Sequence, residues 1–146
     1  MMVRVRPEAT LKLLVELPVG LRIPKPPTVR FTVAALMGGA AHVTSIDSSG
    51  PAIEKAAANV ALNGFAPDRV AFMDADVNAC LRQFATEGRT FDAIVLDPPK
   101  FAPTVTHAER AARAYKDINR LAFKILAPGG VLFTYSCSGG VSADLF

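Results

Sequence analysis

From Phe31 to the end of the chain, apolar runs of strand length alternate with segments of helical periodicity. The strand-like runs are HVTSID (42–47), RVAFMDAD (69–76), FDAIVLD (91–97) and VLFTYSC (131–137). The helix-like segments span 31–39, 50–65, 77–88 and roughly 108–126. Regular alternation of this kind predicts an α/β fold with a doubly wound, mostly parallel sheet flanked by helices.

The run VLDPPK shows where one of these strands ends. Pro98 and Pro99 donate no backbone N–H, so a strand cannot continue through them. Asp97 therefore lies at the carboxyl end of a strand too apolar for the edge of a sheet. A carboxylate in a rigid loop suits a ligand pocket, although a proline-closed turn without a ligand would have the same sequence.

Four side chains with useful chemistry fall at or just after predicted strand ends: Asp47, Asp76, Asp97 and Cys137. Parallel strands present their carboxyl ends at one edge of the sheet, where ligands bind in such folds. Asp47 has the position of an acid that accepts hydrogen bonds from a ribose, but acids also cap helices. Asp76 fits an acceptor for an exocyclic amine or a helix N-cap equally well.

Cysteine and histidine usage limits the other possibilities. Two cysteines are too few for a disulfide framework or a four-ligand zinc site, which favours a reduced, cytoplasmic setting. Neither His42 nor His107 has a metal-ligand neighbour at a useful spacing, so we expect no metal. The segment LKLLVELPVG is short and carries Lys12 and Glu16, which indicates neither a signal peptide nor a membrane span.

The formal net charge of +3 says little about a nucleic-acid partner, because six Lys and Arg against two Glu lie in residues 1–30. Farther on, Arg113, Lys116, Arg120 and Lys124 share one helical face. A solvated face is the simpler interpretation of this row, and a surface for nucleic acid is the alternative.

The Asp-Pro-Pro string resembles motif IV of the S-adenosylmethionine-dependent methyltransferases that act on nucleic-acid bases. Four strings, in order, resemble the ribosomal large-subunit RNA cytosine-5 methyltransferase I family of class I Rossmann-like enzymes. They are TSIDSSGPAIEKAAANVALNG, FDAIVLDPPKFA, RAYKDINRLAFKILAPGG and YSCSGGVSADLF. The resemblance runs from about Phe31 to Phe146. Tyr115, Lys116 and Asn119 match the family's helix after the DPPK loop, and no role is assigned to them.

The resemblance implies S-adenosylmethionine as methyl donor and a cytosine of large-subunit ribosomal RNA as acceptor. It implies that Asp47, with the adjacent Ser48, binds the cofactor ribose and that Asp76, with the Val77 backbone, binds the adenine. Asp97 would line the methyl-transfer pocket and belong to both the cofactor site and the catalytic site.

Cys137 is the candidate nucleophile. Cytosine C5 is a poor nucleophile, and an enzyme can activate it by adding a thiolate to C6. Cys137 lies between two serines and before two glycines, in what reads as an exposed turn, whereas Cys80 shares a helix face with Leu81 and Phe84. A buried, unreactive Cys137 is the plainer alternative.

Residues 1–30 depart from the family pattern. KPPTVR (25–30) stands where members show a Tyr- and Gly-containing cofactor loop. The codons TCC-TAC-GGT-GCG-G encode Ser-Tyr-Gly-Ala and, read one base later, Pro-Thr-Val-Arg, which is Pro27 to Arg30. We therefore divide the chain into an atypical, frameshifted segment (1–30) and a partial methyltransferase domain (31–146). Members also carry an upstream PUA-type domain and a terminal strand pair, so we expect a sheet incomplete at both ends.

Three other functions are compatible with parts of the chain. An amino-group methyltransferase would want an aromatic residue after the two prolines, where Lys100 stands, and would leave Cys137 without a task. An inactive remnant or RNA-binding module would keep the basic helix without catalysis. A nicotinamide-dependent enzyme is disfavoured because no G-x-G-x-x-G precedes a helix.

Overall fold

The computed structural model describes residues 12–16, 31–101, 108–138, 140–142, 144 and 146. The strands are β1 (Lys12–Glu16), β2 (His42–Asp47), β3 (Val70–Asp74), β4 (Phe91–Leu96) and β5 (Leu126–Thr134). The helices are α1 (Phe31–Met37), α2 (Gly50–Leu62), α3 (Val77–Glu87) and α4 (Ala108–Ile125), with a 3₁₀ turn at Pro67–Arg69. All four predicted helices are confirmed.

The helix ends follow local signals in the sequence. Ser49 caps α2 by accepting a hydrogen bond from a backbone N–H in the first turn, and Pro51 occupies that turn. Asp76 caps α3 in the same way. The other end of α3 closes at Gly88, whose φ of 69° is a left-handed conformation that favours glycine.

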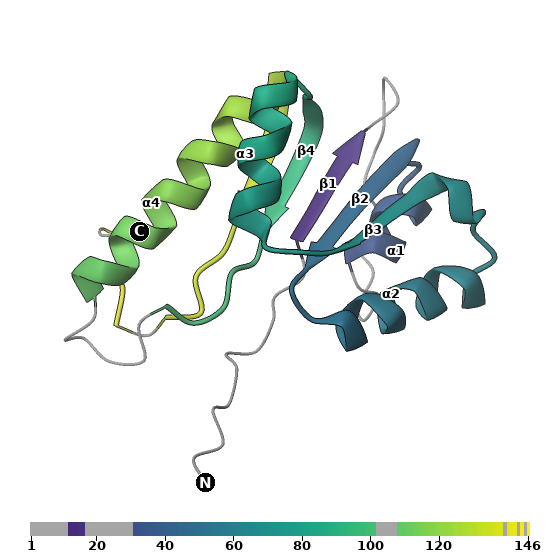
Figure 1. Cartoon of the computed structure of the whole chain (residues 1–146), viewed down its shortest axis with the longest axis horizontal. Coiled ribbons are helices and arrows are strands. Elements are labelled where there is room, and N and C mark those ends of the chain that lie inside the picture. The colour runs from purple at the N-terminus through teal and green to yellow at the C-terminus, as the bar shows by residue number, and fades with distance from the viewer. Residues whose placement is uncertain (1–11, 17–30, 102–107, 139, 143, 145) are drawn as a thin grey trace, which may run out of the picture.

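The described strands form one sheet in the order β3-β2-β1-β4-β5 (Figure 1). Strand β2 is parallel to β3, β4 is parallel to β5, and β1 is antiparallel to both of its neighbours. Four of the five strands therefore point the same way, which confirms the predicted doubly wound, mostly parallel sheet. FDAIVLD is an interior strand, as its apolar sequence predicted.

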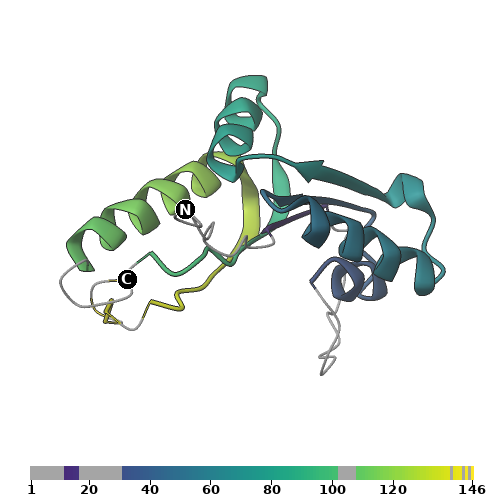
Figure 2. The same ribbon diagram turned by 60° about the horizontal axis from the view of Figure 1, so that its bottom comes forward.

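Helices cover both faces of the sheet. Figures 1 and 2 show α3 and α4 on one side and α1 and α2 on the other. Strand β4 contributes to both cores, because successive side chains of a strand point to opposite faces. Ile94 and Leu96 belong to the core under α3 and α4, and Ala93 and Val95 to the core under α1 and α2. Burial on both faces fixes the register of β4 and hence the place where Asp97 leaves the sheet.

Strand β1 fills the centre of the sheet in the reversed direction. Its first residues pair near the carboxyl ends of β2 and β4, and Glu16 pairs with His42 at the opposite edge. Helix α1 begins back at the carboxyl edge, where the Phe31 ring lies 6.0 Å from that of Tyr135. In a doubly wound nucleotide site, the first strand ends at the edge where the first helix begins. Here β1 ends at one edge of the sheet, and α1 begins at the opposite edge.

The predicted bounds of the last strand are wrong at both ends. The sequence indicated a strand over 131–137, but β5 begins at Leu126, directly after α4, and ends at Thr134. An irregularity in the pairing with β4 takes up the extra residues. Gly129 has a φ of 80°, and a Cβ on Gly130 would lie 2.9 Å from two backbone oxygens. The glycines thus let the strand begin in a bulge.

Candidate functional site: the carboxyl edge of the sheet

The four predicted site positions gather at one edge of the sheet. Because β2, β3, β4 and β5 point the same way, Asp47, Asp76, Asp97 and Cys137 all lie at or beyond the carboxyl ends of these strands. Strand β1 separates β2 from β4, which places the ends of these two strands about 10 Å apart. That spacing suits a ligand that spans the point where the strand order reverses.

Asp47 is the last residue of β2 and is only 1% exposed. Its Oδ1 accepts a hydrogen bond from the Ser49 backbone N–H at 2.9 Å. The Ser49 hydroxyl caps α2, with the Ala52 N–H as donor at 3.4 Å, so Asp47 is not needed as the helix cap. Ser48 beside it is exposed. The Ser49 hydroxyl therefore provides the side-chain cap of α2, and ribose binding by Asp47 stays a prediction.

Asp76 has the role that the plainer interpretation gave it. Its Oδ1 accepts from the Ala79 N–H at 2.8 Å and caps α3 at an exposed position. Val77 follows as the first residue of that helix. The next side chain, Asn78, has a buried Oδ1 with no hydrogen-bond partner among the described residues. Adenine binding by Asp76 stays a prediction, and Asn78 is an acceptor that sequence reasoning missed.

The Asp97 loop and the Cys137 loop lie against each other. The Cys137 Sγ donates a weak hydrogen bond to the Pro98 carbonyl oxygen at 3.8 Å. Just before it, the Tyr135 N–H donates to the Leu96 carbonyl oxygen at 2.9 Å, which holds the chain beyond β5 next to the end of β4. Asp97 itself is half-buried. Asp97 and Cys137, which lie 40 residues apart in sequence, are therefore carried by adjoining loops.

The two cysteines have different surroundings. Cys137 is a free, exposed thiol. Cys80 is 4% exposed and packs with Leu81 and Phe84 in the core under α3 and α4, which confirms the prediction made for that helix face. Burial and the nearby Asp76 carboxylate raise the pKa of the Cys80 thiol. Cys137 is therefore the accessible thiol at this edge.

Tyr115 of α4 joins these loops, and sequence reasoning gave it no role. Its hydroxyl lies 3.0 Å from the Ser138 Oγ, and both residues are buried. Its ring packs against Phe101, with the ring centroids 4.9 Å apart, and against Phe146 at 5.0 Å. A buried tyrosine hydroxyl needs a polar partner, which was the available signal. No spacing rule identifies that partner as Ser138.

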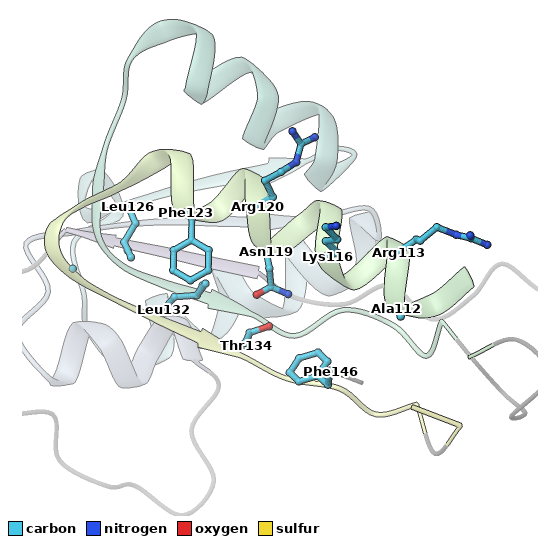
Figure 3. Close-up of a pocket in the computed structure, with 11 residues that line it drawn as sticks. Ala112, Arg113, Lys116, Asn119, Arg120, Phe123, Leu126, Leu132, Thr134 and Phe146 are labelled. Atoms are coloured by element: carbon cyan, nitrogen blue, oxygen red, sulfur yellow. The ribbon is translucent and has the colours of Figure 1, made fainter. Parts of the chain in front are cut away.

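A groove of about 930 Å³ lies between α4 and β5. Its lining residues are Ala112, Arg113, Lys116, Asn119, Arg120, Phe123, Leu126, Gly130, Leu132, Thr134 and Phe146. Figure 3 shows Phe123 of α4 pointing toward Leu132 of β5. The predicted basic row is solvent-exposed, and three of its four members line this groove. One of them, Arg120, lies 3.8 Å from the Asp117 carboxylate, an exposed pair that contributes little to stability.

Two features are absent from the described residues. No three or more His, Cys, Asp or Glu side chains in that part of the chain lie close enough together to hold a metal ion. No helix in the described ranges has the length and apolar character needed to cross a membrane.

Known proteins are similar to this chain in sequence and in fold. A family model described as S-adenosylmethionine-dependent methyltransferase matches residues 24–146. "Ribosomal RNA large subunit methyltransferase I" of Shewanella amazonensis is 49% identical over 119 residues, which are 82% of this chain and 30% of that protein. The protein of the same name from Klebsiella pneumoniae is 49% identical over 116 residues, covering 80% and 29%. The chain thus spans about 30% of the length of these relatives.

Solved structures support the fold. The methyltransferase SMU.776, crystallised with SAH, matches with a TM-score of 0.69 and 24% identity over 80% of this chain and 30% of that one. A methyltransferase from Agrobacterium tumefaciens matches with a TM-score of 0.57 and 24% identity, covering 72% and 34%. These likenesses confirm the Rossmann-like architecture. Because the family match covers 24–146, most of the chain, this protein belongs to the S-adenosylmethionine-dependent methyltransferase family.

Proposed function

We propose that this chain is the catalytic part of an enzyme that methylates C5 of a cytosine in large-subunit ribosomal RNA, with Cys137 as the nucleophile. The observation that carries the proposal is the contact between Cys137 and the Asp-Pro-Pro loop, where the Sγ lies 3.8 Å from the Pro98 carbonyl oxygen. An exposed thiol in contact with the residue that follows a half-buried aspartate, at the ligand edge of a methyltransferase fold, suits covalent activation of a base. The relatives' names supply the RNA class.

The donor site fits S-adenosylmethionine in part. The buried Asp47 carboxylate, with Ser48 beside it, would hold the ribose, because a carboxylate accepts from both hydroxyls. Asp76 and the Val77 backbone would bind the adenine, and the buried Oδ1 of Asn78 is a further acceptor for its amine. When bound, the donor supplies an electrophilic methyl group. Asp97 lies at the end of β4, between this site and Cys137.

The chain's own residues would carry the remaining chemistry. The Cys137 thiolate adds to C6 of the cytosine, and the electron pair of the C5–C6 double bond becomes available at C5. The Asp97 carboxylate accepts from the exocyclic amine of the base and holds the ring over the thiol. After C5 has gained its methyl group, a base removes the C5 proton, the C5–C6 double bond re-forms and the S–C6 bond breaks, which releases the Cys137 thiolate.

We further propose that RNA contacts the basic row of α4. Arg113, Lys116 and Arg120 line the groove beside β5, and Phe123 is 63% exposed on the same helix. Cations that follow a backbone, together with an exposed aromatic ring, are typical of surfaces that bind single-stranded RNA.

Free thiols at both cysteines suit the reducing cytoplasm, where we place the protein.

An inactive remnant is the second candidate, and one observation favours it. Strand β1 is reversed, so the chain does not pass directly from the end of its first strand into α1 at the ligand edge. That connection normally brings backbone N–H groups to the donor.

An amino-group methyltransferase is disfavoured, because the Phe101 ring packs against Tyr115 and is not free to stack on a base.

The proposed domain division places the frameshift before residue 31. The reversed β1 supports a foreign N-terminal segment, although the family match begins at residue 24, seven residues before the proposed boundary. Reading the upstream DNA in its two other frames should give a family-like first strand followed by a Tyr- and Gly-containing loop. If neither frame gives such a sequence, residues 1–30 are native to the chain and the frameshift is refuted.

Calorimetric titration of the folded 146-residue chain with S-adenosylmethionine tests the donor site. We expect saturable binding that Asp47→Ala weakens about 30-fold, because two ribose hydroxyls lose a charged acceptor. Asp47→Asn, which keeps the acceptor for the Ser49 N–H, should weaken binding by a smaller factor. Asp68→Ala is the matched control, since Asp68 precedes β3 at the opposite edge. A folded wild-type chain without binding would favour the inactive remnant.

A further inference from the structure

We propose that Tyr115 is a positioning residue that holds the loops carrying Asp97 and Cys137 in one fixed arrangement. This inference rests on the proposed nucleophilic role of Cys137. Tyr115 is 1% exposed in α4 and reaches both loops: its hydroxyl lies 3.0 Å from the Ser138 Oγ, and its ring packs on Phe101. The helix thereby becomes a common support for two segments that must act together.

The need for such a support follows from the exposure of the nucleophile. Cys137 must be accessible to reach a base, so packing cannot fix its own side chain. Its neighbour Ser138 is 4% exposed, and its backbone takes part in two hydrogen bonds. The Ser138 N–H donates to the Ser136 Oγ at 3.3 Å, and the Ser138 carbonyl oxygen accepts from the Val141 N–H at 3.0 Å. Anchoring Ser138 therefore fixes the backbone that carries the thiol.

The second loop is held by the same ring. The Tyr115 and Phe101 rings meet edge to face, with an interplanar angle of 62°. Phe101 follows the Asp97-Pro98-Pro99-Lys100 sequence, so its packing limits the movement of the carboxylate loop. Tyr115, Ala111, Phe101 and Val141 form a small cluster separate from the two main cores. A cluster of this kind stabilises loops and contributes little to the sheet.

The hydroxyl distinguishes positioning from simple packing. Phenylalanine would fill the same space and keep both ring contacts, but it would lose the bond to Ser138. Reacting groups must stay within a few tenths of an ångström of the productive geometry, and an error of about 1 Å can cost about 100-fold in rate. We expect Tyr115→Phe and Ser138→Ala each to slow attack by Cys137 about tenfold, without changing the affinity for S-adenosylmethionine.

Two measurements on the full chain test this arrangement, in which Tyr115 holds the Asp97 and Cys137 loops and which we call the clamp. The first is the rate of covalent adduct formation with large-subunit ribosomal RNA transcribed with 5-fluorocytidine, in the presence of S-adenosylmethionine. The second is the electron paramagnetic resonance spectrum of a nitroxide on Cys137 in a Cys80→Ala background, where Cys137 is the remaining cysteine. Tyr135→Phe is the matched control, because Tyr135 is 43% exposed and no described contact uses its hydroxyl.

We expect Tyr115→Phe and Ser138→Ala to slow the adduct and narrow the nitroxide lines, and Tyr135→Phe to do neither. The double variant should be no slower than Ser138→Ala, because that single variant has already lost the bond to the Tyr115 hydroxyl. Wild-type rates and line widths in both single variants would overturn the clamp. A wild-type chain without any adduct would instead contradict the proposed function, and the nitroxide spectra would then decide the clamp alone.

Discussion

Replacing Cys137 with alanine should eliminate the covalent adduct between this chain and 5-fluorocytidine-substituted large-subunit ribosomal RNA. The thioether to C6 needs a thiolate, and the fluorine at C5 prevents the elimination that would release it. On natural RNA, the same change should lower methyl transfer by about a thousandfold or more, the scale expected when a nucleophile is removed. Denaturing gel electrophoresis with labelled RNA measures the first effect, and transfer of a radioactive methyl group measures the second.

Cys80→Ala is the matched control for this experiment. Cys80 is buried in the core and its thiol has a raised pKa, so its removal should leave the adduct intact. An adduct that survives in Cys137→Ala would show that another group attacks the base. Loss of the adduct in Cys80→Ala, with the chain still folded, would contradict the assignment as well.

Introducing proline at Leu14 should destabilise the whole domain. Leu14 pairs with Thr44 of β2 on one side and with Ile94 of β4 on the other. Its backbone N–H therefore faces a neighbouring strand, whichever side it points to. Proline removes that donor and cannot occupy an interior strand without disrupting it. We expect the free energy of unfolding to fall by about 3 kcal/mol or more, which would lower the melting temperature by about 10 °C.

Leu14→Ile serves as the control, because it keeps the backbone N–H and favours the strand conformation. Thermal melting followed by circular dichroism compares the two variants with wild type. An unchanged melting temperature in Leu14→Pro would mean that β1 does not lie at the centre of the sheet in solution.

The parts of the fold that were predictable are those fixed by local chemistry. Two prolines after an apolar run place Asp97 at a strand end, and capping residues and glycines mark the helix boundaries at Asp76 and Gly88. Because strands joined by helices run parallel, the gathering of Asp47, Asp97 and Cys137 at one edge followed from the alternation alone. The strings that resemble the methyltransferase family contain these same three residues.

Direction and tertiary partners were not predictable in the same way. The alternation of side chains along a strand is the same read from either end, so KLLVE carries no signal for its orientation in the sheet. The hydrogen bond between Tyr115 and Ser138 joins positions 23 residues apart, and no local sequence motif at either residue predicts the other as its partner. The bulge at the start of β5 depends on close approach to the backbone of β4, which only packing reveals.

The reversed β1 also separates the order of synthesis from the order of assembly. Lys12–Glu16 leaves the ribosome before every other described strand, yet Leu13 finds one of its partners only at Val95. This long-range pairing raises the contact order. It also slows folding, because closing so long a loop costs chain entropy before the strand contacts can stabilise it. The two parallel strand pairs can form early on either side, but they join into one sheet only when the first strand to be made takes its place between them.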